Sequence, residues 1–271
     1  MRIVAIIAVR NEALYLERCI RHLVSEGVEI CLIDNGSTDG TLDIAASYRN
    51  EGVMRIEDLP YTGSFELEVQ CRLKERLARD ISSDWFLHQD ADEIRQSDNW
   101  NTEKLIDAVS DLDRHGFNAV NFDEFVFLPT SPEENFEGLD YVDLMRSYYY
   151  YHPAANRRVN MWKKPRDRPV DLTTSGGHAV DFEGRRIANR SFVLRHYIAL
   201  SEGHAYRKYG VDRSYAAKEI ANRKWHVERE TWKSRHFRFP TQDELKVLAP
   251  GRPFDTSAPT KRHIFWHEQV S

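Results

Sequence analysis

The sequence predicts an α/β fold built on a parallel sheet, and three observations support this prediction. The chain opens on a continuous apolar run from Ile3 to Val9, as expected of a strand that is buried on both faces. Short apolar runs then alternate with apolar residues at helical spacing over the first 128 residues. Polar residues follow several of the predicted strands, at the end of an open parallel sheet where ligands bind.

The predicted elements follow one another regularly in this first part. Strands are expected at 3–9, 28–33, 53–56, 85–88 and 117–128, and helices at about 14–23, from 42 onward, at 66–81 and at 105–112. The second half is less regular, with a short strand expected at 191–198 and a helix from 204 to about 230. We therefore expect a single domain overall, in which residues 1–128 form an α/β core and residues 129–271 an elaborated C-terminal region packed on it.

Composition excludes several classes of protein. Hydrophobic residues make up 41% of the 271 and charged residues 30%, which is typical of a globular chain and not of a disordered one. No apolar run approaches the roughly 20 residues that span a bilayer, and the first strand lacks the cleavage site of a signal peptide. Cys19, Cys31 and Cys71 are odd in number and lack CxxC spacing. The sequence thus predicts no disulfide framework and a cytoplasmic location, with peripheral membrane contact still open.

Charge is divided unevenly along the chain. Residues 1–150 contain 14 Lys and Arg against 30 Asp and Glu, whereas residues 151–271 contain 24 against 13, together with 8 of the 11 histidines. Such a division favours either a site with acidic metal ligands on one side and phosphate-pairing bases on the other, or simple attraction between the halves. No helix-turn-helix or zinc-finger pattern is present, so we expect no nucleic-acid partner.

The strongest chemical pattern is Asp90-Ala91-Asp92 at the end of the 85–88 strand. Two carboxylates one residue apart on a turn can reach the same cation, and Mg²⁺ and Mn²⁺ prefer oxygen ligands that they share with phosphates. The alternative is a helix N-cap with a solvated acidic turn. The position after a Trp-Phe-Leu strand in an α/β sheet favours the metal site.

Three segments together resemble a known family. IIAVRNE, CLIDNGSTDGT and DWFLHQDADE resemble the family 2-type glycosyltransferases, which have the GT-A fold, over about residues 1–128. Over 129–215 the likeness is looser, and RHYIALSEGHAYRKY resembles the late His-Tyr segment of some bacterial branches. The resemblance implies a GT-A-like, Rossmann-type sheet that binds a nucleotide-sugar. It also implies metal-dependent transfer of a sugar, with UDP-sugar as the expected donor, to an acceptor hydroxyl in bacterial surface glycan or glycoconjugate synthesis.

The resemblance also assigns site residues. The nucleotide is expected to contact Ala8, Arg10, Glu12, Asp34 and Asp90. In the family the aspartate that ends the second strand reads the base or ribose, which falls on Asp34. A divalent cation, Mn²⁺ or Mg²⁺, is expected on Asp90 and Asp92, with His196 as the late histidine that completes its coordination.

Other candidates are less closely matched. His178 in the Gly-Gly turn is the rival of His196, either as a metal ligand or on the acceptor side. Basic residues that could approach the nucleotide or its diphosphate are Arg72, Lys74, Arg207, Lys208 and Arg213.

The sequence has no clear counterpart of the residue that acts as general base in the family. Many inverting relatives carry a Glu-Asp pair at a helix start, which we do not find. Asp123 and Glu124 on the 117–128 strand are the first choice, because a carboxylate near the end of the sheet could face an acceptor hydroxyl. Asp171 and Glu202 are alternatives. The tyrosine run 148–151 and Trp162 could stack a sugar, but we favour a role in the core or an interface.

Two rival functions remain at this stage. Phosphatases and phosphotransferases of the haloacid-dehalogenase type also place Asp-x-Asp at a strand end, but usually follow it with threonine, where this chain has Glu93 and Ile94. Trapping of a phospho-aspartate with a fluoride mimic would favour that class. A catalytically inactive nucleotide-sugar-binding scaffold would bind the donor without turnover.

Overall fold

The structure is a computed structural model that describes residues 1–166, 168–212, 214–223 and 237–265. Its contacts divide the chain into two compact units that alternate along the sequence. The first unit contains Met1–Thr62, Glu66–Asp123 and Asn156–Leu194. The second contains Gly63–Phe65, Glu124–Ala155 and Arg195–Ser271.

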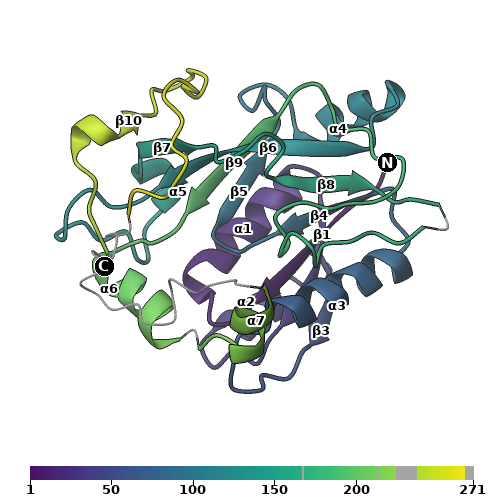
Figure 1. The fold of residues 1–271 in the computed structure, drawn as a ribbon, viewed down its shortest axis with the longest axis horizontal. Coiled ribbons are helices and arrows are strands. Elements are labelled where there is room, and N and C mark those ends of the chain that lie inside the picture. Colours follow the sequence, from purple (N-terminus) through teal and green to yellow (C-terminus); the bar gives the residue numbers. More distant parts are fainter. Residues whose placement is uncertain (167, 213, 224–236, 266–271) are drawn as a thin grey trace. The chain divides into compact units, whose positions relative to one another are not determined.

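A parallel sheet forms the centre of the first unit. β1 (Ile3–Val9) pairs in parallel with both β2 (Glu29–Asp34) and β4 (Trp85–Gln89), and β2 pairs in parallel with β3 (Val53–Asp58), giving the order β3-β2-β1-β4 (Figure 1). The register places Val9 opposite Asp34 and Ile7 opposite Gln89, so the carboxyl ends of these strands lie next to each other. The predicted α/β fold and its parallel core are confirmed.

The sheet becomes mixed beyond β4. β8 (Val159–Lys163) pairs antiparallel with β4, and the first half of β6 (Ala119–Phe127) pairs antiparallel with β8. The sequence did not predict β8, because its apolar residues are few and lie between basic ones. β8 enters the sheet from the less regular half of the chain, so the sheet is parallel over β3-β2-β1-β4 and antiparallel where β8 joins β4 and β6.

Helices and loops bury both faces of the parallel strands. The helices of the first unit are α1 (Ala13–Ser25), α2 (Thr41–Ser47), α3 (Leu67–Asp80) and α4 (Leu105–Arg114). One apolar cluster joins α3 to the strands through Cys71, Leu73, Leu77, Ala78, Val4, Ile6, Phe86 and Trp162. The alternate residues Ile3, Ala5 and Ile7 are also at most 1% exposed. This burial explains the unbroken apolar sequence of β1.

The second unit is built on the second half of β6. β7 (Ser147–Tyr151) pairs antiparallel with it from Glu124 to Phe127, and β10 (Lys246–Val247) pairs with β7. β9 (Phe192–Tyr197) begins in the first unit and continues into the second. The helices of the second unit are α5 (Tyr141–Leu144), α6 (Glu202–Tyr206), a π-helical turn (Arg207–Val211), α7 (Ala217–Arg223) and a 3₁₀ turn (Gln242–Glu244). The single helix expected from 204 to 230 is thus interrupted, and its part after 223 lies outside the described residues.

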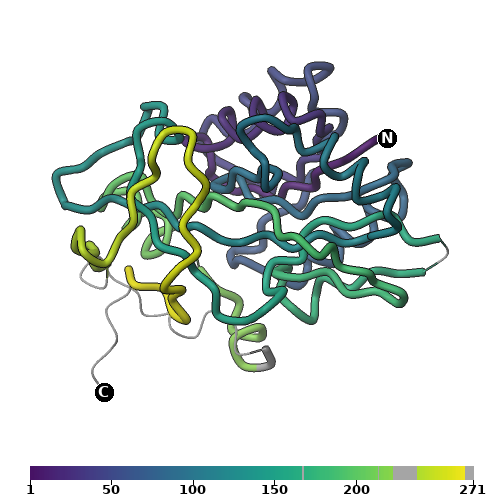
Figure 2. Tube along the Cα trace, turned by 90° about the horizontal axis from the view of Figure 1, so that it is seen from above, coloured from purple at the N-terminus to yellow at the C-terminus, as the bar shows by residue number. Residues whose placement is uncertain are grey.

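The last described segment, which contains Asp255 and Thr260, belongs to the fold of the second unit. Asp255 N donates to the Tyr148 hydroxyl over 2.9 Å, and Thr260 N donates to the Tyr150 carbonyl over 2.8 Å. Figure 2 shows this last segment, in yellow, doubling back on itself. Tyr148, Tyr149 and Tyr150 are at most 7% exposed, so these three residues of the tyrosine run lie in the core, the role that we favoured. In the part of the chain described, no helix has the length and apolarity needed to cross a membrane.

Candidate active site

The loops that follow β1 and β2 are braced against each other. Arg10 donates from Nη1 to the carbonyl oxygens of Asn35, over 3.1 Å, and of Gly36. Its guanidinium also lies 3.4 Å from the centre of the Tyr61 ring. Gly36 has φ of +66°, and a Cβ there would lie 2.9 Å from Cβ of Tyr61, so this position needs glycine. The Arg10 guanidinium therefore stabilises the turn after β2. Arg10 is also one of the residues at which a nucleotide is expected.

Asp34 stands at the base of this turn. It is 5% exposed and accepts a hydrogen bond from Ser37 N over 3.2 Å, an Asx-turn contact. Asp39 bridges the loops by accepting from Thr41 N and Ala13 N. Glu12 immediately precedes α1 and donates its backbone N–H to Thr41 Oγ1 over 2.8 Å. The predicted residues after β1 and β2 thus form one hydrogen-bonded structure around a buried carboxylate.

The Asp-x-Asp residues occupy the turn between β4 and β5 (Glu93–Gln96). The side chain of Asp90 is 51% exposed, and Asp92 as a residue is 7% exposed. The Asp90 N–H donates to Glu93 Oε2 over 3.3 Å. Burial, followed by the charges of Glu93, Asp92 and Asp90, raises the pKa of the Cys19 thiol beneath them. These carboxylates therefore lie close enough to Cys19 for their charges to act on its thiol.

Two basic side chains lie under Asp90. Lys74, on α3, places Nζ 3.9 Å from Asp90 Oδ1 and 3.3 Å from the Gln89 carbonyl. His88 places Nε2 3.7 Å from the same carboxylate oxygen. Burial lowers the pKa of Lys74, and burial together with the charges of Lys74, Arg95 and Arg158 lowers that of His88 well below its usual value. His88 is therefore a neutral ring at physiological pH.

Glu93 and Arg95 form a buried ion pair on β5. Arg95 Nη2 lies 2.6 Å from Glu93 Oε2, and the two side chains are 0% and 1% exposed. The Arg95 guanidinium also stacks 4.6 Å from the Phe122 ring centre. This pair fixes the strand that follows the Asp-x-Asp turn.

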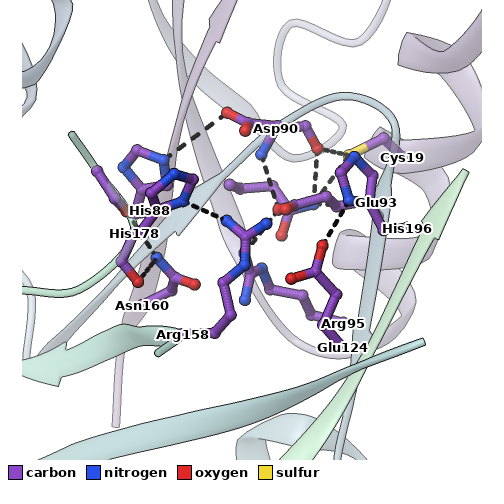
Figure 3. A network of polar contacts seen from close by, with 12 residues as sticks. Cys19, His88, Asp90, Glu93, Arg95, Glu124, Arg158, Asn160, His178 and His196 are labelled. Atoms are coloured by element: carbon purple, nitrogen blue, oxygen red, sulfur yellow. Dashed lines mark hydrogen bonds and ion pairs between the residues drawn. The ribbon is translucent and has the colours of Figure 1, made fainter. Parts of the chain in front are cut away.

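The Gly176-Gly177-His178 turn packs directly beside His88 (Figure 3). Asn160 on β8 donates Nδ2 to the carbonyl oxygens of Gly177, over 2.8 Å, and His178, over 3.2 Å. Arg158 donates Nη1 to His178 Nδ1 over 2.6 Å. Because a guanidinium can only donate, His178 Nδ1 must accept and carries no proton. His178 Nδ1 is therefore committed to Arg158 and is not placed to ligate a metal.

Replacing Gly177 by alanine is expected to destabilise this region. The residue has φ of +80°, and a Cβ would lie 2.5 Å from His88 Cε1, so both the backbone and His88 would have to move. We expect a loss of about 1–3 kcal/mol in unfolding free energy by urea titration. Gly184→Ala, which shares φ of +80° but has nothing within 4 Å of its Cβ, is the control. Equal losses in the two variants would show that the His88 contact adds nothing.

The second unit contains its own histidine–carboxylate pair. His196 Nδ1 lies 2.7 Å from Glu124 Oε1, and these side chains are 16% and 2% exposed. An ionised carboxylate can only accept, so Nδ1 donates and the lone pair of a neutral ring lies on Nε2. This is the arrangement of a metal-ligating histidine held by a carboxylate. His196 and His178 thus have opposite tautomers.

The remaining predicted residues lie in different surroundings. Arg72 is on the exposed side of α3 and pairs with Glu68 over 2.6 Å, whereas Lys74 points to Asp90. Asp171 accepts hydrogen bonds from Thr173 and Thr174 in a turn. In the second unit Lys208 is 5% exposed and Arg207 pairs with Glu137 over 2.5 Å. Ala8 lies on β1, Asp123 on β6 and Glu202 at the start of α6, and each is partly exposed. Arg213 lies outside the described residues.

Sequence reasoning missed Tyr61, His88, Arg158 and Asn160. His88 lies two residues before Asp90 in the sequence, and this position could have indicated its role. The others reach their places through tertiary contacts that no local pattern encodes. Among the described residues, no three His, Cys, Asp or Glu side chains are grouped to hold a metal ion. The predicted coordination by Asp90, Asp92 and His196 therefore stays a prediction.

Comparison with family models gives one match. Residues 4–63 match the model described as Glycosyl transferase family 2. We call these residues the family 2 segment, because they are similar to that family. They contain β1, α1, β2, α2 and β3, and with them the braced turn around Asp34. The resemblance found in the sequence motifs is thus confirmed over residues 4–63.

Solved structures similar to the chain include two bacterial proteins. S. aureus TarS shares 14% identity over 86% of this chain and 44% of its own, with a TM-score of 0.41. Glucosyl-3-phosphoglycerate synthase from Mycobacterium tuberculosis, solved with Mn²⁺, UDP and glucosyl-3-phosphoglycerate, shares 21% over 47% of this chain and 44% of its own, with a TM-score of 0.31. The chain therefore spans less than half the length of each. No curated protein matches the sequence significantly. The match of residues 4–63 to the glycosyltransferase family 2 model is therefore the comparison that supports a functional proposal.

Proposed function

We propose that this chain is a family 2 glycosyltransferase that moves a sugar from a nucleotide-sugar, a UDP-sugar, to an acceptor hydroxyl. One observation carries the proposal. In the first unit, the adjacent carboxyl ends of β1, β2 and β4 present the family 2 segment with its buried Asp34 next to the Asp-x-Asp turn. Ligands bind at this end of such sheets. Asp34 would read the base or ribose, with Ala8, Arg10 and Glu12 framing the nucleotide.

Asp90 and Asp92 would hold a divalent cation, Mn²⁺ or Mg²⁺. Their oxygen donors suit either ion, and the half-exposed Asp90 carboxylate leaves room for phosphate oxygens and water to fill the remaining positions. The tautomer of His196, with Nδ1–H on Glu124, supports its role as a further ligand. The cation would neutralise the charge that develops on the leaving diphosphate.

The acceptor base is proposed on the Asp123–Glu124 pair. Asp123 is partly exposed, whereas Glu124 is 2% exposed and hydrogen-bonded to His196. The burial of Glu124 suits it to orienting the histidine, so Asp123 is the better placed of the two to receive a proton. We further propose that the enzyme acts in the cytoplasm on a bacterial surface glycan or glycoconjugate, with no nucleic-acid partner.

Nucleotide binding is the first test of this function. UDP with Mn²⁺ is expected to raise the melting temperature, because at 100 times Kd a ligand of the native state adds about 2.7 kcal/mol of stability. GDP, CMP, dTDP and ADP serve as comparison nucleotides, each with and without Mn²⁺. Asp34→Ala should weaken UDP binding about tenfold through loss of a charged hydrogen bond, and Asp43→Asn, on the exposed side of α2, should not. No shift with any nucleotide would contradict the proposal.

A further inference from the structure

Arg158 and His178 of the first unit form a hydrogen-bonding pair that the proposed function does not use. His178 Nδ1 accepts from Arg158 Nη1 over 2.6 Å, so the proton of the neutral ring lies on Nε2. Nε2 is then a donor and never an acceptor. Arg158 is 8% exposed, and its backbone is fixed by hydrogen bonds with Asn121 and Phe122. The arginine is therefore a rigid support for one tautomer of His178.

The turn that carries His178 is built onto the Asp-x-Asp end of the sheet. Gly177 approaches His88 so closely that a Cβ would lie 2.5 Å from Cε1, and His88 Nε2 lies 3.7 Å from Asp90 Oδ1. Asn160, 0% exposed, holds the turn by its two hydrogen bonds to Gly177 and His178. Figure 3 shows the Arg158 guanidinium reaching the His178 ring, which lies beside the ring of His88.

Two basic side chains lie close to the histidines at this end of the sheet. Lys74 Nζ lies 3.4 Å from His88 Nδ1, and Arg158 Nη1 lies 2.6 Å from His178 Nδ1. Lys74 is 2% exposed and Arg158 is 8% exposed, so water screens them poorly. Phosphate oxygens are the ligand chemistry that a guanidinium and an imidazole N–H in such a field favour.

We propose that Arg158 is a positioning residue that keeps His178 as an Nε2–H donor, and that this pair binds the phosphate oxygens of the donor's diphosphate. The inference rests on the proposed function. It moves His178, which is partly exposed, from the acceptor side to the donor side of the reaction. Arg158 has no counterpart among the residues assigned from the family resemblance.

Binding of uridine, UMP and UDP, each with Mn²⁺, tests the diphosphate contact by calorimetry. His178→Ala should weaken UDP binding about tenfold or more while leaving uridine binding unchanged, because a hydrogen bond to a charged oxygen is lost. His178→Gln should recover part of the affinity, since its amide can donate. His115→Ala, at the end of α4 with a 66% exposed side chain, is the control.

The tautomer is tested separately by long-range ¹H–¹⁵N NMR of the histidine rings. The wild type and Arg158→Lys should show His178 protonated on Nε2, and Arg158→Met should show a mixture of tautomers. Arg114→Met, with a 71% exposed side chain, should leave the His178 signals unchanged. Circular dichroism confirms that each variant is folded.

Two results would overturn the inference. One is His178 protonated on Nδ1 in the wild type. The other is a folded His178→Ala protein that binds UDP as tightly as the wild type. If the KM for the acceptor rises in that variant, His178 belongs to the acceptor side. Absence of UDP binding by the wild type would instead contradict the proposed function and the diphosphate assignment together. This outcome is seen in the wild type, so it is distinct from a loss of binding in a variant.

Discussion

Replacing Asp92 by asparagine is expected to lower cation-dependent turnover by a factor on the order of 100 to 1,000. A cation that stabilises a leaving diphosphate contributes several kcal/mol to the transition state, and each 1.36 kcal/mol is about tenfold in rate. Asp92 is 7% exposed on the β4–β5 turn, and asparagine keeps its shape while removing its charge. Turnover is measured as UDP released from a UDP-sugar over a range of Mn²⁺ concentrations.

The control for this variant is Asp43→Asn, which removes an exposed carboxylate from α2. Both variants should retain the wild-type circular dichroism spectrum and urea midpoint. Asp92→Asn should also weaken UDP binding in the presence of Mn²⁺ but not in its absence. Normal turnover in a folded Asp92→Asn protein would contradict the assignment of this carboxylate to the cation.

Replacing Arg95 by methionine is expected to destabilise the protein by about 3–5 kcal/mol. The change leaves the Glu93 carboxylate, 1% exposed, without the guanidinium that lies 2.6 Å away. An uncompensated buried charge has this effect on stability, whereas replacing both partners is often close to neutral. Urea unfolding of Arg95→Met and of the double variant Glu93→Gln/Arg95→Met measures the difference.

The double variant should recover a large part of the lost stability. Arg114→Met is the matched control, because it breaks an exposed pair with Asp111 and should change the unfolding free energy by less than about 1 kcal/mol. A loss from Arg95→Met as small as that from Arg114→Met would show that Glu93 is neutralised by another route.

Much of the first unit could be predicted from the sequence, because its strands are short, apolar and separated by helices with clear periodicity. The ends of β1, β2 and β4 lie within two residues of the expected positions, which is why the candidate residues Asp34, Asp90 and Asp92 could be named. Local pattern is sufficient there, since each strand ends in polar residues that must lie at one edge of a parallel sheet.

Other parts of the fold depend on contacts that are distant in the sequence. β8 has few apolar residues, and its place beside β4 follows from burial of Met161 and Trp162, both 0% exposed. The opposite tautomers of His178 and His196 follow from their partners, Arg158 and Glu124, which are 20 and 72 residues away. A lone histidine in a sequence carries no information about which ring nitrogen is protonated.

The alternation of the two units along the chain fixes the order in which they can be completed during synthesis. Every residue of the first unit precedes Arg195, whereas the second unit also requires the last described segment, whose backbone bonds to Tyr148 and Tyr150. A nascent chain therefore contains the whole β3-β2-β1-β4 sheet, with β8 and the His178 turn, while β7 still lacks the segment that covers it. Until β10 pairs with it, the tyrosine-rich β7 is an edge strand with unpaired backbone groups, which is the kind of edge that pairs with other chains.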